Sequence, residues 1–361
     1  MAQRALGKVF LRQTPSVNSR AFSGSTRCLK EPIPEFTPTS TPELDSLLAK
    51  FREKLFIPSS LSPRHQALMF KKKYADQLNN QRVMVNLRGR DEQVRLQPMP
   101  ITEQPSNQDF KTAIKSMSTY EDWCNLQPLL IGLKDSKRVL QPDRLEWLIR
   151  KACDAGKHGI ILECIKKSKI TGLELRGVGA VRILYQGFHA VAQSSGFSKG
   201  VVERSLDQAQ QAAALIQPPK KHKGAVVEED ARKQPDVIGV LLELSASRAL
   251  QSFDGNDQNG EVASYATRTL GTWPAGNFRL PDEAKWSDAN DKLKEMMPLW
   301  NGMKLALKVK EVNADGNLRA NLTRRIRELE PKIEAAMKVI SDAELSYTPI
   351  NLTRSKELFQ Q

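Results

Sequence analysis

The sequence predicts a mainly α-helical protein with a small β-hairpin near its N-terminus and an antiparallel helical hairpin near its C-terminus. Three observations support this fold class. From about residue 109 onward, apolar residues recur every three to four positions, which is the spacing of one helix face. Alternation with period two is confined to the stretch 83–96. Glycine-containing turns divide the helical stretch into paired helices, which predicts an irregular helical-repeat-like domain.

Residues 1–22 have the composition of a mitochondrial transit peptide. The segment alternates cations with apolar residues, hydroxyl residues follow, and the first acidic residue is Glu31. Its cations are Arg4, Lys8, Arg12 and Arg20. An acid-free, Arg- and Ser-rich start predicts import into the mitochondrial matrix. Because Arg20-Ala21-Phe22-Ser23 resembles a matrix processing site, we expect cleavage between Phe22 and Ser23. The alternative is a disordered basic tail on a cytosolic protein.

The net charge indicates an acidic partner. The 361-residue chain carries +14, and removing the four cations of 1–22 leaves +10. A moderate positive excess of this kind suits RNA or an anionic membrane surface. No transmembrane segment is evident in the sequence, so RNA is the favoured partner.

The four cysteines are expected to be free thiols that bind no metal, and we expect the protein to have no cofactor. Cys28, Cys124, Cys153 and Cys164 contain no CxxC pair, and a matrix protein is not expected to carry disulfides. Cys153, His158 and Cys164 lie close in sequence, but their spacing matches no common zinc pattern.

Residues 23–41 are rich in proline and hydroxyl residues, which predicts a disordered linker. A helix should begin at Thr41-Pro42, a favourable pair for an N-cap and a first helical position, and end at Pro58. Its apolar face could dock onto another protein or pack within the same chain. We assign 42–108 to docking helices and a basic β-hairpin.

The hairpin and the helix before it carry the densest basic cluster of the mature chain. Apolar residues alternate with polar ones on both sides of the turn Gly89-Arg90-Asp91. The candidate RNA-binding residues are Lys71, Lys72, Lys73, Arg82, Arg88, Arg90 and Arg95. Cationic groups on a projecting hairpin suit phosphate contact, although a solvated basic surface would have the same composition.

Residues 109–216 form the helical-repeat-like domain. One predicted unit pairs a helix over 145–155 with a second over 158–169, joined by Asp154-Ala155-Gly156-Lys157. At these residues, 145–175 resembles a degenerate pentatricopeptide repeat. The next such turn, at Gly196, lies forty residues beyond Gly156, so the sequence does not predict a regular array that reads one base per repeat.

The C-terminal part divides into an exposed linker over 217–235, a helical region over 236–345 and a tail over 346–361. Two long amphipathic helices are expected to reverse at Asn313-Ala314-Asp315-Gly316, and Pro331 should kink or divide the second one. Both helices carry cations interspersed with glutamates, which favours a solvated surface over an RNA contact.

The sequence contains no recognisable catalytic or nucleotide-binding motif, such as a phosphate loop, a Rossmann fingerprint or a nucleophile elbow. Its four histidines are scattered, and none has a carboxylate pair beside it. We therefore expect a protein that is not an enzyme and has no small-molecule substrate.

Three short stretches carry a resemblance to a known family. They are Phe56-Ile57-Pro58, the segment from Phe70 to Tyr74-Ala75-Asp76, and Leu96-Gln97-Pro98-Met99. They resemble a fungal mitochondrial large-subunit ribosomal protein family. The resemblance implies a structural component of the mitochondrial ribosome that contacts ribosomal RNA and neighbouring ribosomal proteins. The alternatives are a pentatricopeptide-like factor for transcript stability or translation activation, and an assembly factor for a respiratory complex.

Overall fold

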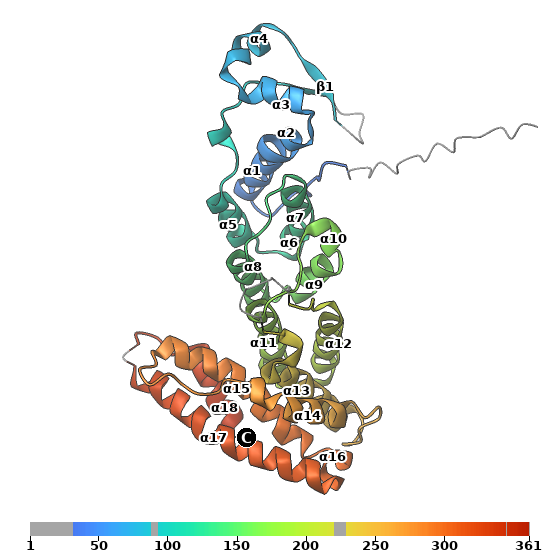
Figure 1. Cartoon of the computed structure of the whole chain (residues 1–361), viewed down its shortest axis with the longest axis vertical. Helices are drawn as coiled ribbons and strands as arrows, with labels where there is room; N and C mark the ends of the chain where they lie inside the picture. Colours follow the sequence, from blue (N-terminus) through green and yellow to red (C-terminus); the bar gives the residue numbers. More distant parts are fainter. Residues whose placement is uncertain (1–31, 88–92, 220–228, 344, 361) are drawn as a thin grey trace, which may run out of the picture. The chain divides into compact units, whose positions relative to one another are not determined.

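The computed structural model describes residues 32–87, 93–219, 229–343 and 345–360. Within the described part of the chain, the residues from Ile33 onward form one compact unit. The described part of the chain is mainly helical and includes one two-stranded antiparallel sheet, which confirms the predicted fold class (Figure 1). The predicted transit peptide and its cleavage site at Phe22 and Ser23 lie outside the described residues.

The N-terminal elements build a helical layer and the small hairpin. They are α1 (Pro42–Phe51), the π-helical segment η1 (Arg52–Phe56), α2 (Ile57–Ser60), α3 (Pro63–Phe70), the 3₁₀ turn η2 (Lys72–Tyr74), α4 (Ala75–Asn80), β1 (Met84–Asn86), β2 (Gln93–Arg95) and the 3₁₀ turn η3 (Ile101–Glu103). In the sheet, Val85 pairs with Val94. The helical path does not end at Pro58 as expected, because η1 carries it on into α2.

The apolar face of α1 is buried within this chain. Leu44, Leu48 and Phe51 are each at most 1% exposed, and α1 contacts α5 (Asn107–Ser116). The ring of Phe56 follows this face and lies directly over Gly132, where any Cβ would clash with it. Of the two interpretations of this helix, packing inside the chain is therefore the one observed.

The segment 33–41 is folded onto the helices, which corrects the prediction of a disordered linker for these residues. Ile33 is buried, and the ring of Phe36 lies 6.1 Å from that of Phe56. Ser40 donates two hydrogen bonds of 2.8 Å to Asp122 in α6 (Tyr120–Cys124). Proline prevents helix formation here, but the extended backbone can still pair its polar groups with side chains.

The central elements form stacked helical hairpins. They are α5, α6, α7 (Leu126–Asp135), α8 (Pro142–Asp154), α9 (His158–Lys166), α10 (Ser168–Thr171), α11 (Val178–Ser194) and α12 (Lys199–Leu215). α8 pairs with α9 and α11 pairs with α12, while α8 contacts α11 and α9 contacts α12. Neighbouring hairpins thus bury one another's faces as repeat units do. The second helix of the first hairpin ends at Lys166 rather than Lys169, and the pentatricopeptide resemblance stays a prediction.

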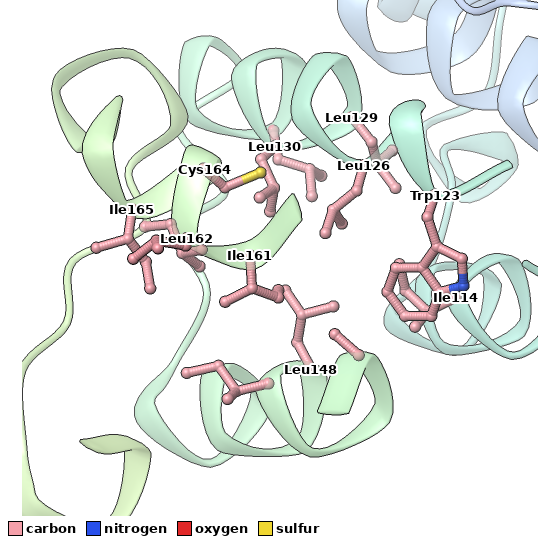
Figure 2. Packing of buried hydrophobic residues seen from close by; sticks show 14 of the residues in the cluster. Ile114, Trp123, Leu126, Leu129, Leu130, Leu148, Ile161, Leu162, Cys164 and Ile165 are labelled. Carbon is pink, nitrogen blue, oxygen red and sulfur yellow. The ribbon is translucent and has the colours of Figure 1, made fainter. Parts of the chain in front are cut away.

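The core of this part lies between α7, α8 and α9. Figure 2 shows Leu126 and Leu130 of α7 facing Ile161 and Leu162 of α9, with Leu148 of α8 on the opposite side. All five side chains are at most 2% exposed.

The C-terminal elements form a further group of packed helices. They are the 3₁₀ turn η4 (Ala231–Lys233), α13 (Pro235–Ser252), α14 (Glu261–Thr272), the 3₁₀ turn η5 (Trp273–Ala275), α15 (Trp286–Ala306), α16 (Lys310–Ala314), α17 (Gly316–Asp342) and α18 (Ile350–Gln360). α13 contacts α11 and α12 on one side and α14 and α15 on the other. The buried hydrophobic residues form two clusters, an N-terminal one that extends from Ile33 to Leu244 and a C-terminal one that extends from Leu242 to Leu358. On α13, Leu241 and Leu244 belong to the N-terminal cluster, whereas Leu242 and Ala246 belong to the C-terminal cluster. α13 therefore joins the two cores.

α13 and α15 approach each other at two glycines. A Cβ on Gly239 would lie 2.8 Å from Leu299 Cα, and one on Gly302 would lie 2.9 Å from the Gly239 carbonyl oxygen. Real Cβ atoms do not approach other atoms this closely, so both positions require glycine.

The predicted C-terminal helical hairpin is formed by α15 and α17, but its turn is misplaced in the prediction. Asn313 and Ala314 belong to α16, and the chain reverses over 307–315. Val309 and Val312 are fully buried and hold this connector on the core. The turn residues Asn313 to Gly316, on which the prediction was based, give no indication of this burial. Asp315 caps α17 by accepting hydrogen bonds from the N–H groups of Asn317 and Leu318.

Pro331 was expected to kink or divide the second long helix, and α17 continues through Pro331 without division. Pro331 lies on the exposed face of α17, where water can solvate the carbonyl that proline leaves unpaired. The residues expected to be a tail include α18, which packs on α15 through buried Leu352 and Leu358. The exposed linker predicted at 217–235 includes 220–228, which lie outside the described residues. Next to them, Ala231 and Gln234 are buried.

Candidate nucleic-acid interface

The basic cluster lies on a small subdomain made of α3, η2, α4 and the hairpin. Its interior consists of buried Leu78, Leu87, Leu96 and Met99. The Leu96 N–H donates to the Val83 carbonyl at 2.9 Å, and the Met99 N–H donates to the carbonyl at the end of α3 at 3.0 Å. The first bond extends the pairing of the two strands, and the second ties the segment after β2 to α3. The other face of the hairpin is left in solvent.

The alternation of the hairpin decides which of its side chains can reach a partner. Val83, Val85 and Val94 point inward and are half-buried. Successive side chains of a strand point to opposite faces, so Arg82 and Arg95 share the exposed outer face. Arg95 lies opposite Met84, which is 49% exposed. This part of the predicted set is therefore brought together on one surface.

The lysine triplet lies at the end of α3 and in η2. Lys71, Lys72 and Lys73 are all exposed, and Lys73 Nζ lies 4.7 Å from the centroid of the Tyr74 ring. The structure thus presents five of the seven predicted RNA-binding side chains to solvent. The other two, Arg88 and Arg90, lie outside the described residues.

One exposed cation was missing from the predicted set. Arg64, in the first turn of α3, is exposed and precedes Lys71 by seven residues, which is about two helical turns. That spacing could have revealed it. Between residues 62 and 99 the sequence contains eight arginines and lysines and three acidic residues, a net charge of +5. We call Arg64, Lys71, Lys72, Lys73, Arg82 and Arg95 the basic hairpin surface.

A second polar constellation, which the sequence did not reveal, is buried where α11, α13 and α15 meet. Arg182 donates to Asp236 at 2.7 Å and lies 3.3 Å from Glu295. Deeper, Glu243 is fully buried, lies 2.6 Å from His189 Nδ1, and accepts a hydrogen bond of 2.7 Å from Asn301. Because buried charges are stable only when paired, this network fixes the three helices relative to one another.

A cavity of about 660 Å³ opens beside this network, lined by α8, α11, α15 and α18. Arg182 and Glu295 contribute to its wall but are already paired with each other. This ion pair joins α11 to α15, and neither Arg182 nor Glu295 is free to act as an acid or a base in the cavity.

Cys153, Cys164 and His158 pack among the central helices. Burial raises the pKa of both Cys153 and Cys164 to about 12, so both thiols are protonated at neutral pH. Burial also lowers the pKa of His158. Cys153 and His158 pack against Gly187, where a Cβ would lie 2.7 Å from each. Among the residues with described positions, no group of three potential ligands gathers to hold a metal ion.

No helix in the described ranges is both long and apolar enough to cross a membrane.

Comparison with known proteins identifies relatives over nearly the whole chain. The sequence profile of the family described as mitochondrial ribosomal protein mS27 matches residues 20–357. The small ribosomal subunit protein mS27 of Neurospora crassa is 26% identical over 358 residues, covering 91% of this chain and 90% of the relative. The predicted resemblance to a mitochondrial ribosomal protein is thus supported. Its assignment to a large-subunit family is wrong, because the matched family is that of mS27 and the relative bearing this name is a small-subunit protein.

Proposed function

Because the chain belongs to the family of mitochondrial ribosomal protein mS27, we propose that it is a structural, non-catalytic protein of the small subunit of the mitochondrial ribosome. Its partners are ribosomal RNA and other ribosomal proteins, and it works in the mitochondrial matrix. The transcript-factor and assembly-factor alternatives are not favoured, because the match to a ribosomal protein family extends over most of the chain.

The basic hairpin surface is the proposed RNA contact. Its six cations are exposed on one small subdomain, and Arg88 and Arg90 lie between the two strands in the sequence. Arginine and lysine bind phosphate oxygens without reading the base sequence, and each contact releases counterions. Within the described ranges, Asp76 is the acidic residue of 62–99 that could offset this charge.

A sedimentation experiment tests both parts of the proposal. The full chain should co-sediment with the small subunit in matrix extracts at moderate salt, in amounts equal to other subunit proteins. Co-sedimentation with the large subunit alone, or as a free particle, would contradict the assignment.

The RNA contact is tested by a matched pair of double variants. Arg82→Gln with Arg95→Gln should release the chain from the subunit at lower salt than wild type, because two phosphate contacts are lost. Lys199→Gln with Arg204→Gln removes the same charge from exposed positions on α12 and should leave release unchanged. Equal salt resistance of the two variants would contradict the hairpin contact.

A further inference from the structure

The first half of α17 carries four arginines, and the structure separates one from the other three. The Arg325 guanidinium lies 4.9 Å from the Trp273 ring centroid and 2.7 Å from a carboxylate oxygen of Glu328. Arg325 is therefore engaged in packing α17 against the rest of the molecule.

The remaining three, Arg319, Arg324 and Arg327, are exposed. The hydrogen bonds of Arg319 and Arg324 go to the neutral residues Asn313 and Asn321. None of the three forms an ion pair with a described acidic residue, and the sequence from 316 to 327 contains no acidic residue. Arg319 and Arg327 are eight residues apart, so this arginine face extends about 12 Å along the helix.

We infer that this arginine face is a second contact with the phosphate backbone of ribosomal RNA, separate from the basic hairpin surface. The inference rests on the proposed ribosomal function. Guanidinium groups without acidic partners suit phosphate oxygens, with which they form paired charge-assisted hydrogen bonds.

The composition of the surface favours RNA over an acidic protein. Protein interfaces place apolar side chains at their centre, but none of the exposed large hydrophobic residues found in the described chain lies on α17. Asp315 already accepts hydrogen bonds from the first free amides of α17, so the attraction comes from the arginine side chains rather than from the helix terminus.

The two surfaces belong to different parts of the core. α17 packs in the C-terminal hydrophobic cluster, whereas the hairpin packs in the N-terminal one. α13 contributes residues to both. The protein would therefore bind ribosomal RNA at two separate sites, and its own helices would fix the distance between these sites. Such a protein would hold two segments of RNA relative to each other, instead of making a single peripheral contact.

A salt titration tests the inference on the full chain, with small-subunit ribosomal RNA as the probe. A chain with Arg319→Gln, Arg324→Gln and Arg327→Gln loses three phosphate contacts. Its slope of log affinity against log salt should be less steep by about 2 to 3, since each contact contributes about 0.7 to 0.9 to the steepness. Lys338→Gln on the same helix, with Glu334 and Asp342 four residues to either side, should leave the slope unchanged. An unchanged slope in the triple variant with native helical content would overturn the inference.

Directed hydroxyl-radical probing in assembled small subunits separates this inference from the proposed function. In a chain with Cys28→Ser and Cys124→Ser, iron is tethered through Asn321→Cys on α17 or through Gln97→Cys beside the hairpin, both at exposed positions. We expect cleavage of ribosomal RNA from both positions, at different nucleotides. Cleavage from Gln97→Cys alone would overturn the second contact and support the hairpin contact. Cleavage from neither position would overturn both, and crosslinking of α17 to an acidic protein instead of RNA would also overturn the inference.

Discussion

Asn125 holds the extended backbone of Thr37 through a pair of hydrogen bonds. Its side-chain oxygen accepts from the Thr37 N–H at 2.8 Å, and its amide donates to the Thr37 carbonyl at 3.0 Å. The two residues are 88 positions apart in the sequence. Asn125 is 1% exposed, so its amide takes the place of a neighbouring strand for a segment that has none.

We expect Asn125→Ala to lower the free energy of unfolding by about 1 to 3 kcal/mol, because it removes two hydrogen bonds to the backbone of Thr37. Urea denaturation of the full chain followed by circular dichroism measures this change. Asn79→Ala, at an exposed position in α4, is the control and should change stability by less than about 0.5 kcal/mol. Equal stability of the two variants would show that the pairing contributes nothing.

Asp122 should make stability depend on pH. Burial by itself would raise the pKa of Asp122, but hydrogen bonds from the backbone N–H groups of Thr119, Ser40 and Ser118 outweigh it and hold the pKa well below its usual range. A carboxylate with a lowered pKa stabilises the fold at neutral pH, and this contribution is lost as the pH falls below the unfolded value of about 3.9.

Wild type should therefore exceed Asp122→Asn in unfolding free energy by about 1.5 to 3 kcal/mol at pH 7, the usual range for charged hydrogen bonds. The difference should shrink as the pH is lowered toward 3. Asp282→Asn, which neutralises an 86% exposed carboxylate, should have the same unfolding free energy as wild type at every pH. A difference between wild type and Asp122→Asn that stays constant with pH would refute the role given to the carboxylate.

The contact between α13 and α15 predicts opposite outcomes for glycine substitutions. Gly239→Ala and Gly302→Ala place a Cβ within 3 Å of the backbone of the neighbouring helix, so each should cost about 1 to 3 kcal/mol. Gly200→Ala in α12 has nothing within 4 Å and should be neutral or stabilise by up to about 1 kcal/mol. Thermal unfolding of the three variants measures the contrast, and similar melting temperatures would argue against the close approach.

The C-terminal helix α18 should contribute substantially to stability. Leu352 and Leu358 are 3% and 5% exposed, and the Phe359 ring lies 4.8 Å from that of Trp300. Leu352→Ala and Leu358→Ala should each cost about 2 to 5 kcal/mol, as is usual for buried leucines. Glu357→Ala, at an exposed position of the same helix, should have little effect. Chemical denaturation that shows no loss for either leucine variant would mean that α18 is dispensable.

The elements with strong periodicity were predictable. Leu44, Leu48 and Phe51 follow the 3.6-residue repeat and are buried together, and Val83, Val85 and Val94 follow the two-residue repeat and point inward. Such patterns are local, so they need no knowledge of distant partners. The charge cluster at Lys71–Lys73 was equally visible, because charged side chains away from any apolar pattern tend to stay in solvent.

The contacts that join distant segments were not predictable. Ser40 and Thr37 belong to a proline-rich stretch whose composition indicates a linker, yet Asp122 and Asn125 bind it. The burial of Val309 and Val312, which places the C-terminal reversal earlier than predicted, was not predictable either. Nor was the packing of α18, a segment that the sequence indicated only as a tail. Whether a polar or short apolar segment is ordered depends on which side chains meet it, and these come from far along the chain.

By itself, the sequence determined the helical class, the place of the β-hairpin and the basic character of residues 62–99. The tertiary structure decided which arginines are available to a partner. Arg325 is paired and packed against Trp273, whereas Arg319, Arg324 and Arg327 on the same helix face solvent. Composition and spacing are properties of the chain, but the availability of a charge depends on neighbours that only folding brings within a few ångströms.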